Sequence, residues 1–249
     1  MALSGIQIYK LLPQTNCKEC GFPTCLAFAM KLAAKQVELS ACPYVSEESK
    51  AQLEESSAPP IRLITLKSDG YEVKAGNEVV MYRHEKTFYN KPGLFVKIKT
   101  STPESEIKFM AQRIQDYRVN YVGIDLEVDG IALEDDTNDS DKMNAALVAV
   151  RSVCKKPVML FSANLASIEN ALSNLNDEIP LIGFAKTDNW EKFGEVAKQK
   201  KAAVAVMADN LDTLADLTEK IKSMGVEDIV LVPEGKNLGH ELMLQTQIR

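Results

Sequence analysis

Cysteines are concentrated in one short segment near the amino terminus. Four of the five follow the spacing C-x2-C-x4-C-x16-C, at Cys17, Cys20, Cys25 and Cys42. The first pair lets two thiolates converge from one tight loop, in which Gly21 and Pro23 supply turn residues. In a chain with no sign of export, grouped cysteines are more often a metal site than a set of disulfides. The pattern therefore predicts that these four cysteines bind metal.

Two kinds of metal site suit four thiolates. A 4Fe–4S cluster is held by four cysteines, and a proline directly after a ligating cysteine, as in Cys42-Pro43, is common around such clusters. Structural zinc also takes four thiolates, but it usually combines one C-x2-C pair with a second pair or with histidines. The third and fourth cysteines here are single and unequally spaced. This favours the cluster over zinc, with unligated core thiols as the third alternative.

Acidic residues at expected strand ends are weaker candidates. Asp125 and Glu127 fall at the carboxyl end of an expected second strand, where barrel enzymes place catalytic groups. Without a partner histidine or lysine, we interpret them as surface or loop-capping acids, and Asp209-Asn210 and Glu234-Gly235 in the same way. The run EDDTNDSD at 134–141 lacks the glycine and the closing glutamate of a calcium loop, so it is interpreted as a solvated loop and helix cap.

The remaining reactive side chains favour structural roles. His84 and His240 are the only histidines, which excludes a multi-histidine metal site, and both are interpreted as packing or capping residues. Cys154 precedes basic residues at an expected helix end, and a buried structural thiol is favoured over a reactive one. Lys10 and Lys18 lie beside and inside the cysteine loop. They are interpreted as surface charges, with docking or tuning of a cluster potential as the alternative.

Composition narrows the class of protein. The 249 residues carry a formal net charge of −6 and only 6% aromatic residues, which argues against a nucleic-acid binder. No apolar run approaches the roughly 20 residues that span a bilayer. The start, MALSGIQIYKLLPQ, lacks the basic region and cleavage site of a signal peptide. We therefore expect a cytoplasmic protein with no membrane and no nucleic-acid partner.

The elements that must position the cysteines are expected to be helical. The segment LAFAMKLAAKQVELSA, between the third and fourth cysteines, is rich in Ala and Leu and predicts a helix. Its apolar positions at helical spacing are expected to cover the cluster: Leu26, Ala29, Met30, Ala33 and Val37. Residues 46–60 are polar and end in Pro-Pro, which predicts a short helix and then a domain boundary. This divides a cluster domain at 1–57 from a second domain at 58–249.

The sequence of the second domain predicts a hairpin followed by alternating strands and helices. Residues 61–66 and 71–82 flank the turn sequence KSDG and predict the hairpin. Apolar strands are expected at 94–100, 121–127, 157–163, 180–186, 202–208 and 228–234. Helix signals lie between them, including Ser101 to Glu104 as a helix start and Gly225 as the end of a helix over 212–224. Residues 239–249 are expected to belong to a sixth helix. Strands that are apolar throughout predict a parallel sheet buried on both faces.

Two architectures accommodate about six such units. One is a doubly wound sheet, but neither G-x-G-x-x-G nor G-x4-G-K-[ST] is present, which lowers the dinucleotide-binding option. The other is an incomplete TIM (β/α)8-type barrel. The fold class is therefore expected to be α/β: a small α-helical 4Fe–4S domain followed by a barrel of about six βα units. Two more units would need on the order of 50 further residues, so we interpret the chain as a fragment.

The cysteine segment resembles a known family. The pattern L-P-x-x-x-C-x2-C-G-x-P-T-C-x2-F-A, followed by C-P sixteen residues later, is similar to the cluster domain of the corrinoid iron–sulfur protein large subunit. The same subunit is called gamma in the acetyl-CoA decarbonylase/synthase complex. Further resemblance lies in APPI at 58–61 and YRHEKTFYN at 82–90. The similarity runs along the whole chain, but its specificity lies in residues 1–92.

The resemblance implies a methyl carrier. In that family a cobamide accepts a methyl group from methyltetrahydrofolate or a related pterin, through a methyltransferase, and delivers it to acetyl-CoA synthase/CO dehydrogenase. The 4Fe–4S cluster re-reduces Co(II) to Co(I), and the barrel pairs with a small subunit. By motif match the ligands would be Cys17, Cys20, Cys25 and Cys42. The carboxy-terminal cobamide-binding domain is absent from this sequence, so no cobalt contact is assigned and an enzymatic role stays open. The alternative is a stand-alone 4Fe–4S electron-transfer module on a barrel scaffold.

Overall fold

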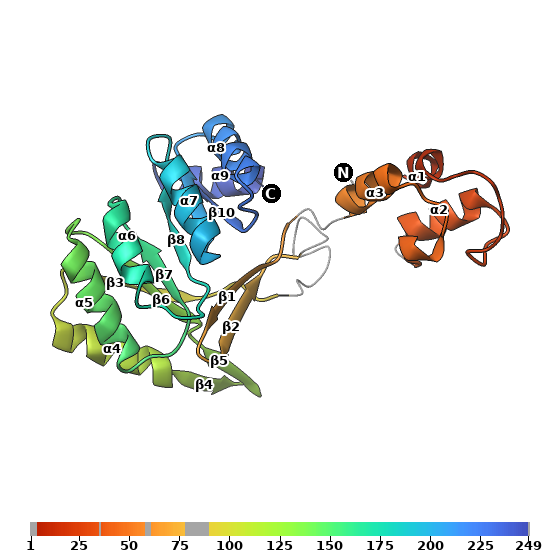
Figure 1. Ribbon diagram of the computed structural model, residues 1–249. Coiled ribbons are helices and arrows are strands. Elements are labelled where there is room, and N and C mark those ends of the chain that lie inside the picture. Colours follow the sequence, from red (N-terminus) through yellow and green to blue (C-terminus); the bar gives the residue numbers. More distant parts are fainter. Residues whose placement is uncertain (1–3, 35, 58–60, 78–89, 249) are drawn as a thin grey trace. The chain divides into compact units, whose positions relative to one another are not determined.

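A computed structural model describes residues 4–34, 36–57, 61–77 and 90–248 (Figure 1). Their contacts separate two compact units, residues 1–62 and 63–249. The first unit is helical, with α1 (Gly5–Leu11), α2 (Cys25–Ala33), a 3-10 turn (Leu39–Ala41) and α3 (Glu47–Ser57). Both α2 and α3 lie where the sequence predicts helices.

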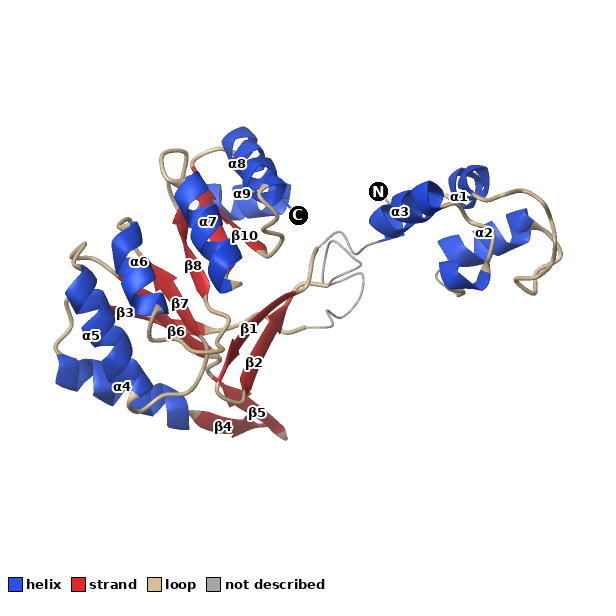
Figure 2. Ribbon diagram, in the orientation of Figure 1, coloured by secondary structure: helices blue, strands red, loops and turns tan. Residues whose placement is uncertain are grey.

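The second unit combines two small hairpins with a parallel sheet (Figure 2). The hairpins are β1 (Ile64–Ser68) with β2 (Tyr71–Ala75), and β4 (Arg118–Tyr121) with β5 (Ile124–Glu127). The six parallel strands are β3 (Phe95–Lys99), β6 (Gly130–Glu134), β7 (Val158–Phe161), β8 (Leu181–Ala185), β9 (Ala203–Ala208) and β10 (Ile229–Pro233).

Helices connect the parallel strands. They are α4 (Glu104–Asp116), α5 (Ser140–Arg151), α6 (Leu165–Leu172), α7 (Trp190–Lys200) and α8 (Leu211–Ser223), with α9 (Leu238–Ile248) after the last strand. Helices α4 to α8 each pack against the next one along the chain, and they cover one face of the sheet (Figure 1). The helix α8 ends before Gly225, which has φ +88°, as the sequence predicts. The helix α4 starts with Pro103 as its cap, without the side-chain hydrogen bond expected from Ser101 or Thr102.

The sheet order follows the chain order, β3-β6-β7-β8-β9-β10. A doubly wound sheet reverses its order at a switch point, and no reversal occurs among the described strands. Neither edge strand, β3 or β10, pairs with the other, so the described strands form an open sheet and a closed TIM barrel is not confirmed. What is observed is an α/β unit with a six-stranded parallel sheet.

Side chains alternate between the two faces of the sheet. In β9, Val204 and Val206 pack into the core beneath the helices, whereas Ala203 and Ala205 face the opposite side. On that opposite side the hairpin β1–β2 contributes Leu66 to a second, smaller core. The helix-covered core is the larger of the two, so most of the apolar burial of this unit lies between sheet and helices.

One expected strand is wrong. Residues 121–127 do not form the second parallel strand, because Tyr121 and the residues from Ile124 belong to the antiparallel hairpin β4–β5. The second parallel strand is instead β6, with the sequence GIALE, which pairs with β3 and β7. The other five expected strands contain β3, β7, β8, β9 and β10 and are confirmed.

Candidate metal centre

The amino-terminal unit builds a small core around a cysteine. Phe28 and Ala29 of α2 are fully buried against Ile8 of α1 and Leu53 of α3. Cys25 belongs to this buried set, and Cys20 and Cys42 pack against it from partly buried positions. Three of the four motif cysteines therefore meet at one apolar cluster, although they are up to 22 residues apart in sequence.

The loop between α1 and α2 is held in an unusual backbone conformation. Gln14, Asn16 and Lys18 all have positive φ values, between 50° and 65°, and Gly21 has φ +82°. Asn and Gly tolerate this region better than other residues, because it brings Cβ close to the backbone. The N–H of Gly21 donates to the carbonyl of Lys18 at 2.9 Å, closing a turn between Cys17 and Cys25. The loop thus curls back toward the start of α2.

Asn16 fastens this loop to Cys25. Its side-chain Oδ1 accepts from the Cys25 N–H at 2.8 Å, and its own N–H donates to the Cys25 Sγ at 3.4 Å. Cys25 is the first residue of α2, and the Thr24 hydroxyl caps that helix by accepting from Ala27 N–H. A helix amino terminus stabilises negative charge, and an N–H bonded to sulfur does the same. Both groups are therefore placed to act on a sulfur that binds metal.

Cys42 packs against the same apolar core from a different segment of the chain. It follows the 3-10 turn, and its N–H donates to Leu39 carbonyl oxygen at 3.0 Å. Burial raises the pKa of the Cys42 thiol, the backbone N–H of Tyr44 opposes this, and negative charge on Cys20, Cys25 and Cys17 raises it further.

A hydrogen bond joins the two cysteine-bearing segments. The Tyr44 hydroxyl donates to Glu19 Oε1 at 2.8 Å, which ties the first C-x2-C pair to the segment after Cys42. This bond, together with the charge of Glu19, raises the pKa of the Tyr44 hydroxyl. Cys17 is exposed, Cys20 and Cys42 are half-buried, and all five cysteines are free thiols.

This arrangement suits a sulfur-bound cluster. Four thiols and backbone N–H groups are the donor set of such sites, and converging thiols must lose their protons for metal to bind. Among the described residues, no three His, Cys, Asp or Glu side chains lie close enough to share a single metal ion. A four-iron cluster is larger than one ion, so its ligands stand farther apart.

The apolar cover of the cysteines differs from the sequence expectation. Ala29 is buried, and Ala33 and Val37 are partly buried against the cysteine core, Val37 beyond the end of α2. Leu26 and Met30, however, are 43% and 55% exposed. The large buried side chain is instead Phe28, whose ring lies 5.7 Å from that of Phe22. Position 28 lies three residues after Cys25 and therefore on the same side of the helix. The burial of Phe28 could thus have been predicted from the sequence.

The carboxyl end of the parallel sheet carries a polar network that sequence reasoning missed. Asp135 follows β6 and is only 7% exposed. It accepts from Ser162 Oγ at 2.7 Å and from the N–H groups of Thr137 and Asp139 at 3.2 and 3.4 Å. Burial raises the pKa of this carboxyl, but the hydrogen bonds outweigh burial and hold the pKa below its usual range. The run 134–141 caps α5 through Asp139, as expected, but it is not simply solvated.

The proposed strand-end acids divide into two groups. Asp125 and Glu127 do not lie at the carboxyl end of a parallel strand. They project from the exposed strand β5, where Arg118 pairs with them at 3.4 and 3.0 Å. Asp209-Asn210 and Glu234-Gly235 do follow β9 and β10, and Asn210 caps α8 by accepting from Thr213 N–H.

The surroundings of the remaining candidate residues fit structural roles. His240 Nδ1 accepts from Lys236 N–H at 3.1 Å, which is a capping role. Cys154 is fully buried after α5, and burial raises its pKa. Lys10 and Lys18 are exposed. His84 and most of the YRHEKTFYN stretch lie outside the described residues.

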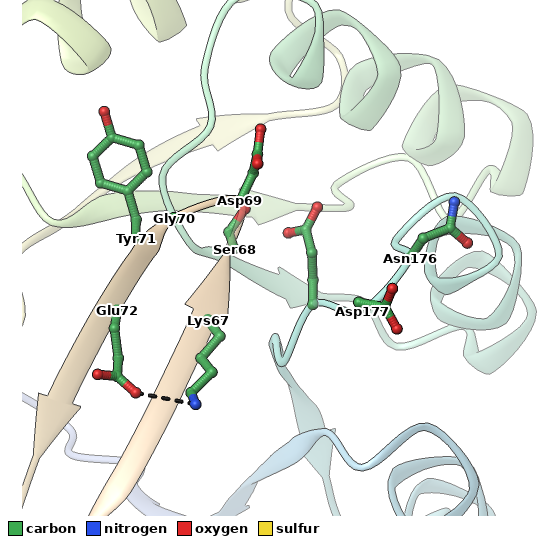
Figure 3. Close-up of a pocket in the computed structure, with 9 residues that line it drawn as sticks. Lys67, Ser68, Asp69, Gly70, Tyr71, Glu72, Asn176 and Asp177 are labelled. Atoms are coloured by element: carbon green, nitrogen blue, oxygen red, sulfur yellow. Dashed lines mark ion pairs between the residues drawn. The ribbon is translucent and has the colours of Figure 1, made fainter.

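A cavity of about 600 Å³ lies beside the turn of the β1–β2 hairpin (Figure 3). Two of its acidic lining residues are paired with lysines: Glu72 with Lys67 at 3.2 Å, and Asp69 with Lys155 at 2.7 Å. These lysines hold the pKa of both carboxyls below their usual range; for Glu72, Lys74 contributes most. The lining segment 176–178 precedes β8, at the amino end of the sheet, where stability rather than catalysis is usually found. We therefore assign this cavity no catalytic role.

Comparison with known proteins finds a match in each part of the chain. Residues 63–249 match the family CO dehydrogenase/acetyl-CoA synthase delta subunit, and residues 12–44 match a model whose description is that of an Fe-S cluster. The corrinoid/iron-sulfur protein large subunit of Moorella thermoacetica is 33% identical over 100% of this chain and 56% of its own length. The acetyl-CoA decarbonylase/synthase complex subunit gamma 2 of Methanosarcina thermophila is 39% identical over 92% of this chain and 50% of its own length.

The chain spans about half the length of the curated relatives that it matches. The expected resemblance to the large, or gamma, subunit is confirmed by these relatives. In the described part of the chain, no helix has the length and apolar character needed to cross a membrane. Through residues 63–249, the chain belongs to the CO dehydrogenase/acetyl-CoA synthase delta subunit family.

Proposed function

We propose that Cys17, Cys20, Cys25 and Cys42 hold a 4Fe–4S cluster and that the chain acts as the large subunit of a corrinoid iron–sulfur protein. The observation that carries the proposal is the meeting of Cys20, Cys25 and Cys42 at one apolar core, with Cys17 three residues before Cys20 in the same loop. The match of residues 12–44 to an Fe-S cluster model supports the same assignment.

The residues around the cysteines have separate tasks in this proposal. Asn16 N–H and the start of α2 stabilise negative charge on Cys25. The Phe22–Phe28 pair and Leu39 exclude water from the inner side of the site. Exposed Cys17 leaves the outer side open to a redox partner. When bound, the cluster would supply single electrons at low potential, which in this family serve to return Co(II) to Co(I).

The wider role is proposed from the resemblance to the large, or gamma, subunit. We propose that the chain takes part in carrying a methyl group from methyltetrahydrofolate or a related pterin to acetyl-CoA synthase, in the cytoplasm. Its partners would be a small subunit, a pterin methyltransferase and acetyl-CoA synthase/CO dehydrogenase, and a cobamide would be the methyl carrier. In this proposal the ordered β3-to-β10 sheet forms part of a TIM-barrel wall, because barrel strands also follow chain order.

A narrower function is a 4Fe–4S electron-transfer module. It is favoured by the Fe-S match within a unit that has its own core. The two functions differ in partner, since only the large-subunit role requires binding to a small subunit and a corrinoid. Anaerobic pull-down followed by a cobalt assay of the eluate separates them, because a module alone retains no cobalt.

The cluster itself is tested by elemental analysis. Anaerobically reconstituted protein is expected to contain about four irons and four sulfides per chain, with little zinc. Cys42→Ser should remove most of the iron, because it deletes one of four ligands. The matched control is Cys154→Ser, a buried cysteine of the other unit, which should leave the iron content unchanged. About one zinc per chain and no iron would overturn the assignment.

A further inference from the structure

Two hydrogen bonds close the segment that carries the first three motif cysteines. Asn16 lies directly before Cys17 and is bonded to Cys25, nine residues further along the chain. Its side-chain Oδ1 accepts from Cys25 N–H at 2.8 Å, and its backbone N–H donates to Cys25 Sγ at 3.4 Å. Cys17 and Cys20 lie between these two ends. The two bonds, called the Asn16 latch below, therefore close the segment that contains both of them.

Asn16 meets two separate requirements of this position. Its φ is +50°, in the left-handed region where asparagine is enriched among non-glycine residues. Its short side chain also carries a carbonyl oxygen that can accept from a nearby backbone N–H. Glycine would fit the same backbone without the acceptor, whereas aspartate would keep an acceptor of the same size. The two requirements can therefore be separated by substitution.

Cys25 is the fixed end of the latch. It is the first residue of α2, and it is only 6% exposed among the apolar residues of the amino-terminal core. Asn16, by contrast, is exposed and belongs to the loop between α1 and α2 (Figure 1). The latch thus ties an exposed loop to a buried helix start. Without it, the positions of Cys17 and Cys20 relative to Cys25 would be less restricted.

A closed loop holds metal more firmly than an open one. A flexible loop loses conformational entropy when its ends are brought together, and a loop that is already closed loses less on binding. One hydrogen bond of ordinary strength changes an equilibrium by about fivefold. Because Asn16 is exposed and lies outside the apolar core, we expect the latch to affect metal retention rather than folding of the unit.

The second bond of the latch acts on the sulfur itself. In a cluster held by Cys25, an N–H that donates to the ligating sulfur stabilises negative charge there. A reduced cluster carries one more negative charge than an oxidised one, so this N–H favours the reduced form and raises the reduction potential. Asn16 acts through Cys25 in this way and is a positioning residue.

We propose that Asn16 is the positioning residue of the metal centre. Its side chain holds the three-cysteine loop closed, and its N–H raises the reduction potential of a cluster bound through Cys25. The proposal rests on the cluster function proposed above, and it names the residue that controls how firmly the cluster is held and how readily it is reduced.

Gln14 provides a matched control in the same loop. It lies two residues before Asn16, is exposed, and also has a positive φ, of 57°. Its side-chain amide donates to the carbonyl of Tyr9 at 3.3 Å and not to a cysteine. Substitutions at Gln14 therefore change the same backbone conformation or add the same charge without touching the latch.

The first test measures the rate at which the anaerobically reconstituted full chain releases metal to a chelator. Asn16→Gly keeps the backbone conformation but removes the acceptor, so release should be about fivefold faster than in the wild type. Asn16→Asp keeps the acceptor and should release metal at the wild-type rate, as should Gln14→Gly. A residue needed only for its positive φ could be replaced by glycine without loss. Equal release rates for Asn16→Gly and the wild type would therefore overturn the latch.

The second test measures the midpoint potential of the cluster by a redox titration followed by EPR. Asn16→Gly should shift the potential to a more negative value, because the N–H is less well fixed on the sulfur. Asn16→Asp should also shift it negative, because a carboxylate beside Cys25 opposes the added electron. Gln14→Glu adds the same charge farther from Cys25 and should shift the potential less. A shift in Asn16→Asp no larger than that in Gln14→Glu would refute the effect on potential.

The metal content of the wild type separates this proposal from the cluster assignment. About four irons per chain would support the cluster, and the two tests then decide the role of Asn16. About one zinc and no iron would overturn the cluster and the effect on its potential, whereas the rate of zinc release would still test the latch. A wild-type chain that binds neither metal would overturn both proposals.

Discussion

Replacing Asp135 by alanine tests the polar network at the carboxyl end of the sheet. The carboxylate is 7% exposed and accepts from Ser162, at 2.7 Å, and from two backbone N–H groups. A hydrogen bond to a charged group contributes about 1.5–3 kcal/mol, and each buried donor left without a partner costs about 1–3 kcal/mol. Because removing the buried charge also relieves its desolvation, we expect a net loss of about 3 kcal/mol in the free energy of unfolding.

The assay is thermal and denaturant unfolding followed by tryptophan fluorescence. Trp190 is the only tryptophan and lies at the start of α7, so it reports on the second unit alone. A loss of 3 kcal/mol corresponds to a decrease in melting temperature of about 6–12 °C for a unit of this size. The control Asp209→Ala removes an exposed acid after β9 and should change the free energy of unfolding by less than about 0.5 kcal/mol.

The pH dependence provides a second check. The pKa of Asp135 is lowered in the folded protein, so its stabilisation is present above the unfolded pKa of about 3.9 and is lost as pH falls through the folded value. The difference between wild type and Asp135→Ala should therefore be full at pH 7 and shrink below about pH 4. A difference under 0.5 kcal/mol at pH 7, or one that grows in acid, would refute the reasoning.

Three further experiments probe other parts of the molecule. Phe28→Ala leaves a cavity in the core beside the cysteines and should lower the free energy of unfolding by about 3–5 kcal/mol. Because the unit is so small, this loss should abolish iron loading, measured by elemental analysis. Arg151→Ala removes the partner of Glu178, whose side chain is 12% exposed, and should lower the free energy of unfolding in denaturant by about 3–5 kcal/mol. Lys108→Ala, which breaks an exposed ion pair, should lower it by under about 1 kcal/mol. In native apo-protein at pH 8, iodoacetamide followed by mass spectrometry should label exposed Cys17 but not Cys154, whose burial raises its pKa; labelling of Cys154 would contradict its buried position.

The cysteine motif and most of the strands could be predicted from the sequence, because both depend on local pattern. Five apolar runs and the KSDG hairpin lie where period and turn residues indicate. The prediction of a parallel strand over 121–127 was wrong because the alternating sequence YVGIDLE suits a half-buried strand of a hairpin as well as a strand of the main sheet. Val122, the first residue of the turn, is not a residue type that marks a hairpin, so the turn at 122–123 could not be predicted from residue type.

Residue chemistry by itself determined the metal hypothesis, since spacing and residue type decide which ligands a loop can offer. Only the tertiary structure decided the surroundings of those residues. It brought Cys42 to the loop that carries Cys20, buried Asp135 beneath Ser162, and left Asp125 on an exposed hairpin. These outcomes depend on contacts between segments distant in sequence, and a side chain's burial and partners are set by those contacts rather than by its neighbours along the chain.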